Sequence, residues 1–211
     1  MARYRGPVCK ICRRSGEKLF LKGDRCVGPH CVVDRRATSR GSARSAARRP
    51  KVSERGLQLR EKQKARYTYG VLERQFRRYF AQAKKKAEGV TGENLVQVLE
   101  ARLDNVVFRL GFGKSRSQAR QVVLHGHIKV NGRRVNVPSY CVRAGDVISW
   151  GEKAAKTELY RVVVEGIGDR IVPDWLSLDT QTMSGQVVGQ PTREQVDARF
   201  NEKAIVEYYS R

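Results

Sequence analysis

Apolar residues recur at helical spacing along three stretches in the first half of the chain. These stretches cover about 57–69, 70–87 and 93–110. The 70–87 stretch is apolar on one face through residues such as Phe76 and Phe80, and its opposite face is rich in lysine and arginine. Because apolar side chains three or four positions apart share one side of a helix, the pattern predicts three amphipathic helices.

A capping signal introduces a shorter helix. Ser115 stands three residues before Gln118, as in a capping box, where the hydroxyl accepts from the Gln118 amide and the Gln118 side chain reaches back. Gly126 suits the left-handed conformation that commonly ends a helix. We therefore expect a helix over about 116–125.

Alternating spacing follows that helix and indicates strands. Ile128 and Val130 alternate with polar residues, and Asn131-Gly132 has the composition of a tight hairpin turn. Further strands are predicted for the returning segment 135–137 and for 147–150 and 159–164. From about 168 the pattern is irregular until a last helix, predicted from residue 192 to about residue 208. The chain should thus contain short helices on an antiparallel sheet, with a C-terminal helix.

Charge is distributed unevenly along the chain. There are 43 Lys and Arg against 21 Asp and Glu, a formal net charge of +22, and residues 1–90 hold 26 basic and 7 acidic side chains. The basic side chains repel one another in the isolated chain, which favours a polyanionic partner. We expect no membrane association, because no apolar face accompanies the charge and no run of about 18 apolar residues could cross a bilayer. The N-terminal residues lack the apolar stretch of a signal peptide, so we expect a cytoplasmic protein with reduced thiols.

A basic arm covers residues 32–52. Its arginines stand among Ser, Ala and Gly, and hardly any apolar side chain there could pack. We expect the arm to be poorly ordered alone and to settle on a phosphate backbone. The candidate phosphate contacts of the arm are Arg35, Arg36, Arg40, Arg44, Arg48 and Arg49. Those of the two helices that follow are Arg66, Arg74, Arg77 and Arg78.

The helix predicted over 116–125 has the composition of an anion-binding surface. Arg116 and Arg120 are four residues apart, so they share a face close to the N-terminal amides of the helix. Arg109 can join them from the preceding helix. The donors extend along the loop and hairpin through His125, His127, Lys129, Arg133 and Arg134. Such a cluster can clamp phosphates and 2′-hydroxyls of double-helical RNA, although a solvated face without a ligand is the alternative.

Four of the five cysteines lie near the N-terminus at metal-ligand spacing. Cys9, Cys12, Cys26 and Cys31 read C-x2-C-x13-C-x4-C, two close pairs that can close on one ion. Zinc is the default for a four-cysteine site, and a [4Fe–4S] cluster on the same thiolates is the alternative. His30 could replace Cys31 as a ligand.

These elements predict an α+β fold. Its parts are a metal-binding knuckle and basic arm over 1–45, a helical domain over 46–92 completed by the C-terminal helix 192–211, an αβ module over 93–167 and an irregular connector over 168–191.

Catalytic interpretations do not fit the sequence. Gly113-Lys114-Ser115 has the form of the end of a phosphate-binding loop, but Phe108 stands where that loop needs glycine, and a helix rather than a strand precedes it. We interpret Asp104 as a structural partner of an arginine and Cys141 as a small core residue. No nucleophile–base pair stands out, so we expect no enzymatic activity.

Several longer motifs are specific in combination. They include Arg102-Leu103-Asp104-Asn105, Phe108-Arg109-Leu110-Gly111-Phe112, Ser115-Arg116, Ala119-Arg120-Gln121, His125-Gly126-His127, Val130-Asn131-Gly132, Pro138-Ser139-Tyr140 and Ile205-Val206-Glu207-Tyr208-Tyr209-Ser210. Over essentially the whole chain the sequence resembles the bacterial small-subunit ribosomal protein four family, including its αβ RNA-binding module. Gly113 and Trp150 differ from the residues that are more common there, and the cysteine knuckle resembles one branch of the family only.

This resemblance implies a structural protein of the small ribosomal subunit. Its expected roles are to bind small-subunit ribosomal RNA at a multi-helix junction, to nucleate assembly of the subunit body and to contribute to translational accuracy. Expected neighbours are other ribosomal proteins, especially small-subunit protein five, and the path along which messenger RNA enters; no small-molecule substrate is expected. Ser115 joins the arginines, histidines and lysine named above in the expected RNA-contact set.

Two other classes remain open at this point. An RNA-modifying enzyme, such as a pseudouridine synthase with a similar αβ module, would need a catalytic domain that the short segment after the last predicted strand cannot supply. A zinc-finger DNA-binding protein would need a recognition helix at the knuckle, where residues 13–16 and 27–30 have the composition of turns.

Overall fold

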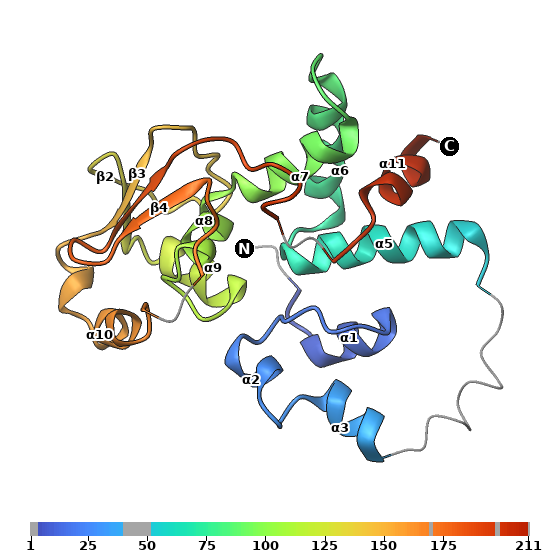
Figure 1. Ribbon diagram of the computed structural model, residues 1–211, viewed down its shortest axis with the longest axis horizontal. Coiled ribbons are helices and arrows are strands. Elements are labelled where there is room, and N and C mark those ends of the chain that lie inside the picture. Colours follow the sequence, from blue (N-terminus) through green and yellow to red (C-terminus); the bar gives the residue numbers. More distant parts are fainter. Residues whose placement is uncertain (1–3, 40–51, 169–170, 197–198, 211) are drawn as a thin grey trace. The chain divides into compact units, whose positions relative to one another are not determined.

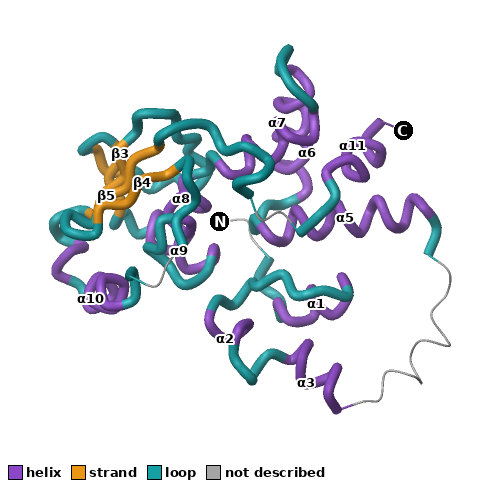
Figure 2. Tube along the Cα trace, viewed as in Figure 1, coloured by secondary structure: helices purple, strands orange, loops and turns teal. Residues whose placement is uncertain are grey.

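A computed structural model describes residues 4–39, 52–168, 171–196 and 199–210. The chain divides into two compact units. The first unit comprises Met1–Ala81 and Ala198–Arg211, and the second comprises Gln82–Asp197. Figures 1 and 2 trace the elements of each. None of the helices in these ranges is long and apolar enough to cross a membrane.

The first unit begins with short helices around the predicted knuckle. They are α1 (Val8–Ser15), α2 (Asp24–Val27) and α3 (Val32–Ser39). Ile11, Cys12 and Leu19 form a small buried cluster at this end of the chain. Residues 13–15, expected to form a turn, are the last turn of α1, which ends where Gly16 adopts φ 77°. The start of the basic arm is likewise helical, as α3.

Longer helices complete the first unit. They are α5 (Glu54–Thr68), α6 (Glu73–Lys85), which begins in this unit, and α11 (Glu202–Ser210). Ser53 caps α5 by accepting from the Gly56 amide at 3.2 Å. The predicted return of the C-terminal helix is confirmed, because α11 packs along α5. The last helix starts at Glu202, however, and not at residue 192.

Polar contacts fix α11 in this position. Gln58 Nε2 donates to Glu207 Oε2 at 3.0 Å. The Glu73 carboxylate accepts from Lys62 Nζ at 2.9 Å and from the Tyr209 hydroxyl at 3.0 Å. Burial alone would raise the pKa of Glu73, but the hydrogen bond and charge of Lys62 outweigh it and lower that pKa. The carboxylate is therefore ionised and joins α5, α6 and α11.

The second unit begins with helices that the sequence pattern merged into one. The stretch expected as a single helix over 93–110 is divided into α7 (Thr91–Glu100) and α8 (Leu103–Arg109). Arg102 between them has extended backbone, with ψ 135°. There the chain pairs with a distant segment, since the Val142 amide donates to the Ala101 carbonyl at 2.8 Å. The next helix, α9 (Arg116–Leu124), agrees with the prediction.

An antiparallel sheet follows, with strand order β2-β1-β3-β5-β4. The strands are β1 (Ile128–Val130), β2 (Arg133–Arg134), β3 (Val147–Trp150), β4 (Leu176–Asp179) and β5 (Ser184–Val187). Asn131 and Gly132 both have positive φ, as the predicted hairpin turn requires. The expectation of an irregular connector over 168–191 is wrong, because β4 and β5 lie within it. The returning strand is Arg133–Arg134, so the strand expected over 135–137 is wrong.

A helix stands where the pattern indicated a strand. Residues 159–164 belong to α10 (Glu158–Glu165), which follows a short 3-10 turn at Ala154–Lys156. Thr157 caps α10 by accepting from the Tyr160 amide at 3.4 Å. Val163 is buried, whereas Val162 and Val164 are about two-fifths exposed. Only one of these three consecutive valines is buried, as on one face of a helix. The strand prediction for 159–164 was therefore wrong.

The core of the second unit joins α8, α9 and the sheet. It includes Leu110, Ile128, Ile148, Met183 and Val187, each at most 3% exposed. Gly185 on β5 lets α8 approach closely, since a Cβ there would stand 2.4 Å from a methyl carbon of Leu110. The segment beyond residue 168 thus supplies part of the core that holds the αβ module together.

Candidate nucleic-acid interface and metal centre

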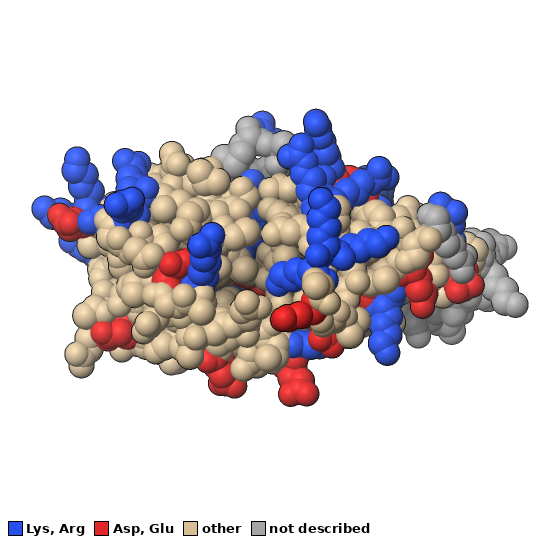
Figure 3. All heavy atoms as spheres, turned by 90° about the horizontal axis from the view of Figure 1, so that it is seen from above, with Lys and Arg blue, Asp and Glu red and all other residues tan. Residues whose placement is uncertain are grey.

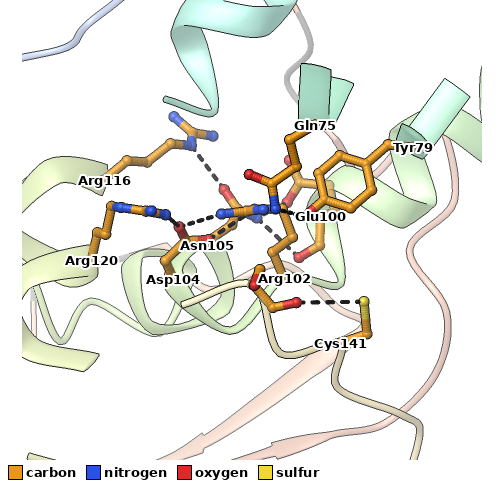
Figure 4. A network of polar contacts seen from close by, with 10 residues as sticks. Gln75, Tyr79, Glu100, Arg102, Asp104, Asn105, Arg116, Arg120 and Cys141 are labelled. Atoms are coloured by element: carbon orange, nitrogen blue, oxygen red, sulfur yellow. Dashed lines mark hydrogen bonds and ion pairs between the residues drawn. The ribbon is translucent and has the colours of Figure 1, made fainter. Parts of the chain in front are cut away.

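A buried charged network links α7, α8 and α9 (Figure 4). The Glu100 side chain at the end of α7 is fully buried. Arg109 holds it with two parallel hydrogen bonds, from Nε at 3.0 Å and from Nη2 at 2.8 Å. Asn105 Nδ2 donates to the same carboxylate at 2.6 Å. Such bidentate, charge-assisted contacts offset the desolvation of both ions.

A second ion pair lies beside the first. Arg102, fully buried, donates from Nε at 3.0 Å and from Nη2 at 2.6 Å to the two oxygens of Asp104. Arg120 Nη1 donates to Asp104 Oδ2 at 2.7 Å. The prediction that Asp104 is a structural partner of an arginine is confirmed, and it has two such partners.

Arg109 and Arg120, which we expected to contact phosphate, are therefore largely buried on carboxylates, and Arg116 is partly buried. The side chain of Arg120 is 13% exposed and that of Arg109 is 16% exposed. Arg116 Nε donates to Asn105 Oδ1 at 2.8 Å, and its guanidinium lies 4.5 Å from the centre of the Phe108 ring. Helical spacing placed Arg116 and Arg120 on one face correctly, but that face packs against α8. These side chains are therefore already paired within the module, and their contact with RNA stays a prediction.

The capping signal of α9 is confirmed with one difference. Ser115 Oγ accepts from the Gln118 amide at 3.3 Å, as predicted. Gln118 Oε1 does not return to the Ser115 amide but accepts from the Lys114 amide at 2.8 Å. Ser115 thus acts as a cap in this structure.

The remaining predicted donors of this unit surround the β1–β2 hairpin. Arg133 is exposed on β2, and Arg134 Nη2 donates to the His125 carbonyl at 3.0 Å. That guanidinium lies against Gly126, which has φ +67°. Lys129 Nζ forms an ion pair with Glu152 Oε1 at 2.8 Å. The hydrogen bond from Lys129 lowers the pKa of Glu152, so this carboxylate is ionised at neutral pH.

A cavity of about 400 Å³ opens among these residues. Its lining includes His125, His127, Lys129, Arg134, Glu152 and Lys153. Sequence reasoning missed Glu152 and Lys153. They come directly after β3, and only the pairing of β3 with β1 brings them beside the histidines. No local motif marks that register.

His127 forms an aromatic wall of this cavity. Its ring centre lies 5.8 Å from that of His125 and 6.5 Å from that of Trp150. Burial lowers the pKa of His127, and electrostatic interactions with His125 and Arg134 lower it further. The ring is therefore neutral at pH 7.

In the first unit, exposed cations lie along α6. Arg74, Arg77 and Arg78 are all exposed, and Arg77 Nε lies 3.6 Å from Glu73. Arg66 on α5 is different, because its guanidinium stacks 4.4 Å from the centre of the Tyr67 ring and its side chain is 15% exposed. In Figure 3, many Lys and Arg side chains project from the surface. The predicted cationic face of this helix is thus present.

Most of the basic arm falls outside the described residues. Arg35 is exposed on α3, which also includes Arg36. Arg40, Arg44, Arg48 and Arg49 lie outside the described ranges.

The four N-terminal cysteines line one small cavity, together with Lys18, Lys22, Arg25 and His30. Cys12, Cys26 and Cys31 are buried, Cys9 is partly exposed, and all are free thiols. The Lys22 amide donates to Cys26 Sγ at 3.4 Å. Burial raises the pKa of the Cys12 thiol, against a hydrogen bond from the Leu19 backbone, and the other three cysteines raise it further. A cation beside the Cys12 thiol would favour its thiolate form, which is the form that ligates a metal.

This set of donors suits a single soft metal ion. The cavity that they line is small, at about 20 Å³. Within the described ranges no three His, Cys, Asp or Glu side chains stand close enough to ligate an ion as they are. The donors therefore match zinc in kind and number, and ligation requires the sulfurs to draw together.

Cys141 is exposed and not a core residue. It pairs with Arg102 in an isolated bridge between extended segments. Strand-like composition was therefore a poor guide to burial at this position.

Comparison with known proteins agrees with this architecture. Residues 3–100 match the family described as the ribosomal protein S4/S9 N-terminal domain, and residues 101–148 match the S4 domain. A small ribosomal subunit protein uS4 from Heliobacterium modesticaldum is 56% identical over the full length of both chains. Proteins of the same name from Halothermothrix orenii and Pelotomaculum thermopropionicum are 54% and 53% identical, also over full length. The chain therefore belongs to the small ribosomal subunit protein uS4 family.

Proposed function

We propose that this chain binds small-subunit ribosomal RNA at a multi-helix junction early in assembly, nucleates the subunit body and contributes to translational accuracy. The observation that carries the proposal is identity of 50–56% over the whole chain with proteins named small ribosomal subunit protein uS4. Membership in this family makes the chain a structural protein and not an enzyme. The alternatives of an RNA-modifying enzyme and of a zinc-finger DNA-binding protein have no comparable support.

The distribution of charge supports an RNA backbone as the partner. In the second unit, exposed Arg133, Arg134 and Lys153 surround the hairpin and the cavity. In the first unit, Arg74 and Arg78 stand exposed on α6. Cations of this kind position a protein on phosphates and 2′-hydroxyls without reading sequence, which suits recognition of RNA by shape.

Competition binding tests this function. The purified full-length protein is bound to labelled small-subunit ribosomal RNA, and large-subunit ribosomal RNA or duplex DNA is added as competitor at several salt concentrations. We expect a strong preference for the small-subunit RNA that persists at salt concentrations where non-specific binding is lost. Equal competition by either of the other nucleic acids would contradict the proposal.

We further propose that Cys9, Cys12, Cys26 and Cys31 hold one zinc ion. In that role the ion would clip α1, α2 and α3 together and anchor the base of the basic arm. Four cysteine thiols at one cavity support a metal centre on these residues; zinc is the default for such a set, and a [4Fe–4S] cluster is the alternative. Metal analysis with visible absorption, on protein purified without oxygen, distinguishes them. One zinc per chain without colour supports the clip, whereas iron with acid-labile sulfide and a brown colour would establish the cluster instead.

The proposed setting is the cytoplasmic ribosome. There the chain would contact neighbouring ribosomal proteins, especially small-subunit protein five, and lie near the path along which messenger RNA enters. Chemical crosslinking of intact small subunits, followed by mass spectrometry, tests these neighbours. Crosslinks from this chain that consistently omit protein five would contradict that contact.

A further inference from the structure

The cavity beside the β1–β2 hairpin is too large to be only a phosphate contact. At about 400 Å³ it falls within the roughly 300–1,000 Å³ typical of small-molecule pockets. Contacts to a phosphate oxygen need only donors on a surface, such as exposed Arg133. A volume of this size suits a planar group that enters the protein.

The walls of the cavity suit an aromatic ligand. His127 and His125 line it, with ring centres 5.8 Å apart. Each of the two rings also contacts a neighbouring side chain of the protein. His127 packs near Trp150, which is 8% exposed, and His125 Nε2 lies 2.6 Å from Gln121 Nε2, within hydrogen-bonding distance. A ring fixed in this way offers a stacking face at little entropic cost, as in proteins that bind unpaired bases.

The charges at the cavity also distinguish a base from a phosphate. Glu152 carries an ionised carboxylate among the cations of the lining. A carboxylate repels phosphate but accepts hydrogen bonds from the exocyclic amino groups of bases. Arg134 and Lys153 at the same cavity supply positive charge for the backbone on either side of the base.

We propose that this cavity receives one unpaired base of small-subunit ribosomal RNA. The base stacks on His127 and presents an amino edge to Glu152, while Arg134 and Lys153 hold the flanking phosphates. The inference rests on the RNA-binding function proposed above and adds to it a contact with a single extruded nucleotide.

Salt-dependent binding of the full-length protein to small-subunit ribosomal RNA tests the contact. His127→Ala should weaken binding about tenfold, because a stacked base is lost, and should leave the slope of affinity against salt unchanged. Arg133→Ala, which removes an exposed cation outside the cavity lining, should instead lower that slope by about one unit. Arg161→Ala, on the exposed face of α10, is the control and should bind as the wild type does.

A pair of variants with similar side-chain volume guards against a folding artefact. His127→Phe keeps an aromatic face and should retain most of the affinity, whereas His127→Leu should bind as weakly as His127→Ala. Base-specific chemical probing adds a second measurement. At least one base that the wild-type protein protects should become reactive in the His127→Leu complex.

The possible failures can be told apart. If the wild type shows no preference for small-subunit RNA, the proposed function itself is wrong. If the wild type prefers small-subunit RNA, but His127→Leu binds that RNA equally well and protects the same bases, the proposed base contact is wrong and the proposed function stands. A loss of affinity in His127→Leu that comes with a lower salt slope would identify a phosphate contact and overturn the stacking proposal.

Discussion

Arg120 Nη1 donates to Asp104 Oδ2 at 2.7 Å, and this contact joins the middle of α9 to the start of α8. The same oxygen accepts from Arg102 Nη2 at 2.6 Å. Two guanidiniums thus share one carboxylate inside the αβ module. Arg120 belongs to the internal framework of the module, where it shares its carboxylate partner with Arg102.

Arg120→Ala should accordingly act on stability rather than on RNA binding. We expect the variant to lose about 1–3 kcal/mol of unfolding free energy, because a partner of a largely buried carboxylate is removed. The slope of RNA affinity against salt should stay at the wild-type value. Urea unfolding and filter binding measure the two quantities. Arg133→Ala is the matched control and should keep the wild-type unfolding free energy while lowering the salt slope of RNA affinity. If Arg120→Ala instead keeps the unfolding free energy and lowers the slope, Arg120 contacts RNA.

Glu152→Gln, which keeps an oxygen acceptor for a base amino group but removes the negative charge, should strengthen RNA binding. Glu152 pairs with Lys129 at 2.8 Å, so it neutralises a cation at the rim of the cavity. Without that carboxylate, Lys129 can serve a phosphate, and the salt slope should rise by up to about one unit. Affinity measured across salt concentrations checks this. Glu158→Gln, an exposed acidic residue outside the cavity lining, is the control. If the variant binds every RNA more weakly at all salt concentrations, the hydrogen bonds that the Glu152 carboxylate accepts favour binding more than its negative charge opposes it.

Metal removal should affect only the beginning of the chain. A chelator strong enough to take zinc should loosen α1, α2 and α3, because the small Ile11–Leu19 cluster is the main apolar packing there. The second unit has its own core and should remain folded. Amide hydrogen exchange, resolved by peptide, measures both parts. Exchange that accelerates equally in residues 103–150 would contradict this independence.

The stability of the second unit should depend on the protonation of His127. Its pKa is lowered from the ordinary value of about 6.5, so the unfolded chain takes up the proton first as the pH falls. The contribution is therefore complete above pH 6.5 and is lost as the pH falls through the lower folded pKa. Ring nitrogen shifts in NMR titrations report that pKa, and His127→Phe should flatten the pH dependence of unfolding. Titration of His127 at or above its ordinary value would contradict the prediction.

Local signals were sufficient where residues close in sequence decide the structure. Ser115 caps α9 through the amide three residues on, and Asn131-Gly132 turns the hairpin through its own positive φ angles. The cysteine spacing likewise predicted that four thiols would meet at one cavity. In each of these cases the chemistry depends on a few neighbouring residues.

Prediction failed where distant pairing decides the structure. The break between α7 and α8 depends on the Ala101 carbonyl finding the Val142 amide, and nothing near Ala101 indicates this. The strand prediction over 159–164 failed for a different reason. The valines of α10 have strand propensity, but the Thr157 cap and the single buried valine, Val163, favour a helix. Arg116 and Arg120 were predicted as phosphate ligands because their four-residue spacing places them on one helix face. Their partners Asn105 and Asp104 lie more than ten residues away, and no local motif marks them.

The pairing of α5 with α11 has a consequence for how the chain is made. Residues 69–201 lie between these two helices, so synthesis separates them by on the order of ten seconds at about 5–20 residues per second. The second unit, continuous over Gln82–Asp197, is complete earlier and can fold first. Until Tyr209 emerges, Glu73 lacks its hydroxyl donor and Phe80 lacks its ring partner. Synthesis thus begins with the first unit, but this unit completes its folding last.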